Sequence, residues 1–120
     1  MRVAHAVLAV AMALLAIASG VAKLRGDPHV VHVIHDVVRV PMKWFPWLAG
    51  CELAGAAGLL GGMAWPPLGL AASIGLVLYF LGAVVAHLRV GDLRGTGTPA
   101  FPLGLAVACL VTWFLSAPPR

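Results

Sequence analysis

One carboxylate stands out in this chain because it lies inside a long apolar stretch. Glu52 is one of only four acidic residues among 120. If that stretch crosses a membrane, a charge there costs ~3 kcal/mol on insertion scales, and ionisable groups so placed are by default candidates for functional sites. A protonatable carboxyl can give and take protons. Glu52 is therefore the first candidate catalytic residue.

Helix geometry predicts which side chains share the depth of Glu52. The apolar stretches on either side of Trp65 predict a tight hairpin, in which residues whose numbers add up to about 131 lie level. Tyr79 is then level with Glu52. The same reasoning through the other connections brings Ser19, and Cys109 or Thr112, near that depth, with Lys23 and His87 between this layer and the basic side. We predict a polar pocket with catalytic and substrate-binding roles for these residues: Glu52, Tyr79 and His87 for catalysis, and Ser19, Lys23 and Thr112 for binding.

Two interpretations of Glu52 stay open. In the first it belongs to a small-molecule or ion site. In the second it hydrogen-bonds to Tyr79, Ser19 or Lys23 only to fix how the helices pack, because buried polar groups can specify an arrangement without doing chemistry.

Histidines spaced three residues apart invite a metal assignment. His29, His32 and His35, with Asp36, could share an ion only if further ligands joined them. A solvated face of a helix explains the same spacing, and the Val-rich flanks offer no Cys or second acidic ligand. The two cysteines have no CxxC spacing, and His5 and His87 are expected near opposite surfaces of the membrane, so no haem axial pair is evident. We predict no metal and no cofactor, and the role of the three histidines stays open.

The elements that must position these residues are membrane helices. The chain is 62% hydrophobic and 10% charged, more apolar than a soluble domain of this size can bury. Its apolar stretches are near the ~20 residues that span a bilayer. We predict a single all-α domain over 1–120, an integral membrane four-helix bundle, and its spans are 3–22, 46–64, 68–88 and 101–115.

The segment 28–41 is too polar to cross. At about 100° per residue its three histidines, Asp36 and Arg39 share one face, with Val and Ile elsewhere. We predict a short amphipathic helix in the membrane interface, bounded by two prolines.

Small residues predict how the helices pack. Ala9, Ala13, Ala16 and Gly20 lie along one side of the first span, which should face the bundle. In the second span the same kind of residue recurs every four positions, at Gly50, Ala54, Gly58 and Gly62. This ridge predicts a close helix contact within the bundle, with a homo-oligomer as the alternative.

Basic residues predict the topology. The net charge is +4, but the basic residues are sparse and flank apolar stretches, which argues against nucleic-acid binding. Lys23, Arg25, Arg39, Lys43, Arg89 and Arg94 lie in two connections, against Arg2 and Arg120 at the termini. The positive-inside rule then places these connections in the cytoplasm and both termini outside.

Three segments together resemble the DoxX-like family: Ser19-Gly20-Val21-Ala22-Lys23-Leu24, Gly50-Cys51-Glu52 continuing to Leu60, and Gly82 to Asp92 with Ala-His-Leu-Arg-Val-Gly-Asp. The resemblance implies a four-helix protein of the bacterial cytoplasmic membrane. Better-known relatives are subunits of quinone-linked oxidoreductases, among them thiosulfate–quinone oxidoreductase. By this resemblance the family's Lys falls on Lys23, its intramembrane Glu on Glu52, and its helix-end His and Asp on His87 and Asp92. Asp92 joins the predicted substrate-binding residues for this reason. The histidine segment is not a feature of the family.

Two functions follow as hypotheses. The first is a pocket that takes a lipophilic small molecule from the bilayer, with Glu52 as acid or base in an isomerisation, a cyclisation or an epoxide opening. The second is a non-catalytic accessory or scaffold subunit that docks a redox partner near a quinone. The sequence leaves open whether the protein is an enzyme. Transport is disfavoured because inverted repeats and broken helices are missing.

Overall fold

The computed structural model describes residues 1–92 and 97–116 and is all-α, 87% helical and without strands in that part of the chain. Its elements are α1 (Arg2–Arg25), α2 (Pro28–Val31), the π-helix η1 (His32–Val37), the 3₁₀ helix η2 (Met42–Trp44), α3 (Phe45–Gly61), α4 (Pro66–Arg89) and α5 (Gly97–Ser116).

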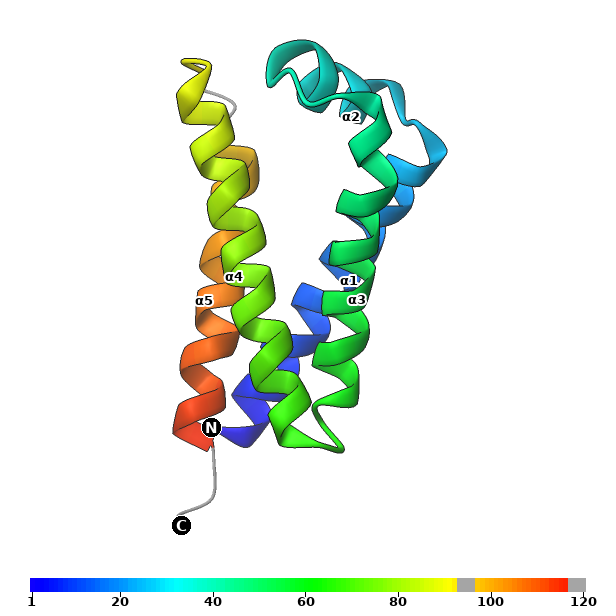
Figure 1. Ribbon diagram of the computed structural model, residues 1–120. Helices are drawn as coiled ribbons and strands as arrows, with labels where there is room; N and C mark the ends of the chain where they lie inside the picture. The colour runs from blue at the N-terminus through cyan, green and yellow to red at the C-terminus, as the bar shows by residue number, and fades with distance from the viewer. Residues whose placement is uncertain (93–96, 117–120) are drawn as a thin grey trace.

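The four long helices alternate in direction (Figure 1). Each packs against two neighbours, in the order α1, α3, α4, α5 around the bundle. Three of them, α1, α4 and α5, are long and apolar enough to cross a membrane, whereas α3 is shorter, with 17 residues. Many large apolar side chains point outward, among them Val3, Leu78 and Phe114. An apolar outer surface on apolar helices is what a bilayer requires.

Local sequence explains where the helices begin and end. Gly26 closes α1 in the left-handed conformation, with φ 65°, which glycine adopts at no steric cost. The Asp27 carboxylate then accepts from the backbone N–H groups of His29 and Val30 and so caps α2. Pro66 and Pro67 occupy the first turn of α4, where the missing N–H groups cost nothing.

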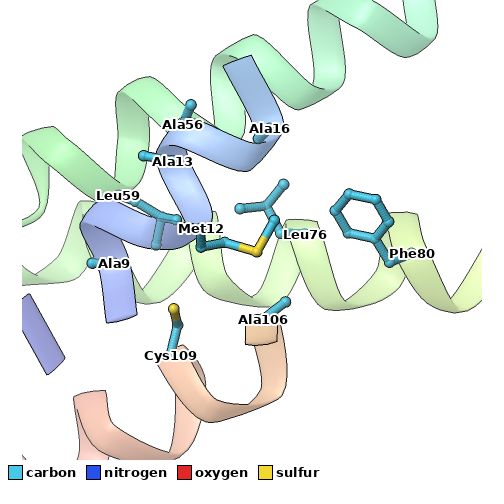
Figure 2. Close-up of a cluster of buried hydrophobic side chains, with 10 residues drawn as sticks. All are labelled: Ala9, Met12, Ala13, Ala16, Ala56, Leu59, Leu76, Phe80, Ala106 and Cys109. Atoms are coloured by element: carbon cyan, nitrogen blue, oxygen red, sulfur yellow. The ribbon is translucent and has the colours of Figure 1, made fainter. Parts of the chain in front are cut away.

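The core lies where α1 meets the other three helices (Figure 2). Met12 of α1 extends toward Leu76 of α4, and Cys109 of α5 and Leu59 of α3 complete the cluster. The predicted inner side of α1 is confirmed, since its four small residues are all buried: Ala9, Ala13, Ala16 and Gly20.

The predicted close packing of the small-residue ridge is confirmed for two of its four residues. Gly58 and Gly62 do pack closely on α4, and an added Cβ at Gly62 would overlap the backbone of Gly69. Gly50 and Ala54, however, are exposed. A repeat of four drifts around a helix of 3.6 residues per turn, so the ridge leaves the interface.

The sequence predicts a helix over 28–41, and the structure confirms it only from Pro28 to Val37, where it divides into an α-helical turn and a π-helix. Its three histidines, Asp36 and Arg39 are exposed, while the Val and Ile side chains from Val30 to Val38 are partly or fully buried. Arg39, with φ 68°, ends the segment. Its amphipathic character is therefore confirmed. In the described ranges no three His, Cys, Asp or Glu side chains come close enough to hold a metal ion.

Candidate functional site

A buried ion pair joins the end of α1 to α3. Lys23 lies in the last turn of α1, and its Nζ contacts Oε1 of Glu52. The Lys23 side chain is 7% exposed and that of Glu52 is fully buried. Nζ also donates to Oγ of Ser19, one turn earlier in α1, at 2.8 Å. Because both charges are removed from solvent, their pairing is what makes the burial of either tolerable.

Tyr79 of α4 joins the same carboxylate. Its hydroxyl donates to Oε1 of Glu52 at 2.9 Å, which confirms that the two residues lie level across the α3–α4 hairpin. Lys23 and Tyr79 thus share one oxygen, whereas Oε2 is buried without a hydrogen-bond partner in the described residues. One carboxylate therefore connects three helices of the bundle.

A cavity of about 570 Å³ lies beside this network, within the size range of small-molecule sites. Ser19, Lys23, Tyr79, His29 and His87 supply its polar lining. Its apolar walls come from α1, the segment after it, and α3, α4 and α5: Leu15, Ala18, Val30, Val33, Ile34, Val38, Val40, Leu48, Phe80, Gly82, Ala83, Ala86, Pro99 and Pro102. Glu52 is not among the lining residues. Its partners, not the carboxylate itself, border the cavity.

His87 lines the cavity and is tied to the end of α4. Its Nδ1 lies 2.9 Å from Oδ2 of Asp92, and the ring is nearly buried. An ionised carboxylate can only accept, so Nδ1 carries the proton and Nε2 of the neutral ring keeps a lone pair. Asp92, predicted as a substrate-binding residue, thus contacts His87 and is not part of the cavity lining.

Thr112 does not belong with this group, and its predicted depth is wrong. Its hydroxyl lies 2.9 Å from Nδ1 of His5. His5 and Lys23 are both in α1, and the 18 positions between them correspond to about 27 Å. The expectation assumed that α5 starts level with the end of α4. Instead the indole N–H of Trp113, near the end of α5, donates to the carbonyl of Pro66 at the start of α4. α5 is therefore displaced along α4 toward the first residue of α4, and the end of α4 extends past α5 (Figure 1).

Sequence reasoning missed one side of the cavity. His29, Val30, Val33 and Ile34 line it, although the segment 28–41 was expected only as an interfacial helix. Its apolar side was visible in the sequence, but what that side covers depends on how the chain returns from α1 to α3. Pro99 and Pro102 of α5 reach the cavity because of the shift of that helix.

A family comparison matches residues 7–111 to the DoxX-like family. The chain belongs to the DoxX-like family. The matched range of this DoxX-like chain includes Ser19, Lys23, Glu52, Tyr79, His87 and Asp92, and it leaves out His5 and Thr112. Searches of curated proteins and of solved structures give no match. The family and the three apolar helices make this a membrane protein.

Proposed function

We propose that this DoxX-like chain spans the membrane four times, as a four-helix bundle. α3 has 17 residues and is therefore about 26 Å long, close to the ~30 Å of a bilayer's hydrocarbon core. Three tryptophans are exposed at the two ends of α3: Trp44 just before it, Trp47 in its first turn and Trp65 beyond its end. Aromatic belts of membrane proteins have this placement. In the proposed topology this is the bacterial cytoplasmic membrane, with both termini outside.

The proposed function is to bind a lipophilic small molecule, taken from the bilayer, in the 570 Å³ cavity. One observation carries it: an apolar cavity has an ammonium group, that of Lys23, and a hydroxyl group, that of Tyr79, fixed on its wall by the same carboxylate. Apolar walls with a few converging polar groups are typical of such sites. Nζ of Lys23 keeps one N–H to donate, and the Tyr79 oxygen, whose proton goes to Glu52, can accept. One donor and one acceptor suit a hydroxyl group in an otherwise apolar ligand.

The same arrangement supports acid/base chemistry. In this proposal Lys23 gives a proton to a ligand oxygen, while Glu52 balances the charge of Lys23 and accepts the hydroxyl proton of Tyr79 without touching the ligand. His87, held by Asp92, supplies a base elsewhere in the cavity. An isomerisation, a cyclisation or an epoxide opening needs no more than this.

Native mass spectrometry of the detergent-purified protein tests the binding function. The wild type should retain a small apolar molecule, and Glu52→Gln and Tyr79→Phe should lose most of it. Thr112→Val, at the other end of the bundle, is the matched control and should retain it. Equal retention by all variants would exclude this cavity as the binding site.

A second candidate is an accessory or scaffold subunit of a quinone-linked oxidoreductase. It is favoured by the exposed small residues of α3, Gly50 and Ala54, which let another helix approach closely, from a redox partner or from a second copy. If Glu52→Gln and Tyr79→Phe leave binding unchanged while Gly50→Leu prevents co-purification of a partner, this function replaces the first.

A further inference from the structure

A second cavity, of about 690 Å³, lies at the opposite end of the bundle. The first helix supplies Arg2 and His5 to its lining, the α3–α4 turn supplies Met63, and α5 supplies Trp113. Pro66, Pro67 and Leu70 of α4 add an apolar wall. In Figure 1 this is the end where the chain begins and α3 turns into α4. Nothing in the proposed function uses this cavity.

The acidic side chains lie away from this cavity. All four acidic residues belong to the other half: Asp27 and Asp36 lie between α1 and α3, Asp92 follows α4, and Glu52 pairs with Lys23. Arg2 is exposed and makes no ion pair with any residue in 1–92 or 97–116. The second cavity therefore has an arginine on its wall and no carboxylate in its lining.

The hydrogen bonds of His5 orient a second nitrogen-bearing side chain at this cavity. The Thr112 hydroxyl donates its one proton to the carbonyl of Ala108 or Cys109. It must therefore accept from Nδ1–H of His5. This bond anchors the ring to α5 through Nδ1. His5 is thus held in place beside the same cavity as Arg2.

Two tryptophans lie close to this cavity. Trp65, in the α3–α4 turn, is exposed, and the indole N–H of Trp113 donates to the Pro66 carbonyl at 2.9 Å. Tryptophan concentrates at the boundary between hydrocarbon and head groups. An arginine at that boundary can pair bidentately with a lipid phosphate.

We propose that the cavity at the Arg2 end binds the phosphate group of an anionic phospholipid, with Arg2 as the principal contact, His5 beside it, and an acyl chain against Met63, Leu70 and Trp113. The shared chemistry, a phosphate, could also come from a free ion. The apolar wall favours the lipid, because a free phosphate ion has no apolar part that could contact this wall.

The test is lipid competition followed by native mass spectrometry. The purified protein is equilibrated with equal amounts of phosphatidylglycerol and phosphatidylcholine of the same acyl chains, which differ only in head group. The wild type should retain phosphatidylglycerol preferentially. Arg2→Gln should reduce that preference about fivefold, the effect expected of one basic residue at an anionic surface, and Arg2→Lys should keep part of it. Arg25→Gln, an exposed arginine at the other end, is the control and should change nothing.

Two results would overturn the proposal. One is an unchanged lipid preference in Arg2→Gln, with helicity by circular dichroism equal to that of the wild type. The other is displacement of phosphatidylglycerol by millimolar inorganic phosphate, which would assign the cavity to the free ion. Because the proposed function concerns the cavity at the other end, Tyr79→Phe should leave the lipid preference as it is, and the two ideas can fail separately.

Discussion

The buried Lys23–Glu52 ion pair should be destabilised more by the loss of one charge than by the loss of both. Removing one member of a buried ion pair leaves an uncompensated charge, whereas removing both leaves none. We predict that Lys23→Met and Glu52→Gln each lower the free energy of unfolding by about 3–5 kcal/mol. The double variant should recover most of that loss. Unfolding in detergent, followed by circular dichroism, measures the four proteins, and additive losses in the double variant would show that the pair is not coupled.

Tyr79 contributes one hydrogen bond to the same carboxylate. Tyr79→Phe keeps the ring, which packs edge-on against Phe80, and removes only the donor. The expected loss of stability is about 1 kcal/mol, the usual net value of a hydrogen bond, measured in the same unfolding experiment. Its effect on ligand retention should be much larger. A loss as large as that of Lys23→Met would mean that Tyr79 is mainly structural.

At the scale of the element, the α3–α4 contact depends on glycine at one crossing point. An added methyl at Gly62 meets the backbone of Gly69, which cannot move aside as a flexible side chain would, whereas the space beside Gly50 is open. Gly62→Ala, at the C-cap of α3, should therefore cost about 1–3 kcal/mol through overpacking, and Gly50→Ala, the control within α3, should cost nothing. Thermal unfolding of both variants in detergent checks this, and equal midpoints would refute the close packing.

The segment 28–41 shows how an element's conformation and its role come from different sources. Its polar and apolar sides follow from a helical repeat, and the polar side chains are exposed as that repeat predicts. That its Val30 and Val33 side chains form a wall of the cavity follows from the connection folding back over the bundle. No periodicity within the segment contains that information.

At the scale of the whole molecule, the number of spans determines where the termini lie. Four spans put both termini on one side of the membrane, whereas three spans, with α3 outside the hydrocarbon, put them on opposite sides. We predict that tags at either end are both accessible to protease from the periplasm of intact spheroplasts. A tag inserted after Lys43 should be cleaved only after lysis. Protection of one terminal tag would refute the four-span topology.

The sequence by itself determined the helical class, the approximate bounds of the four long helices, the buried side of α1 and the pairing of Glu52 with Tyr79. These depend on local quantities: apolar length, the rise per residue, and a short turn at Trp65 that leaves little freedom between α3 and α4. Only the tertiary structure decided that Lys23 contacts the carboxylate, that Glu52 stays behind the cavity wall, and that Thr112 lies with His5. Those depend on how far one helix slides along another, which is set by side-chain packing between segments distant in the chain, and each residue of such a shift moves a side chain by about 1.5 Å.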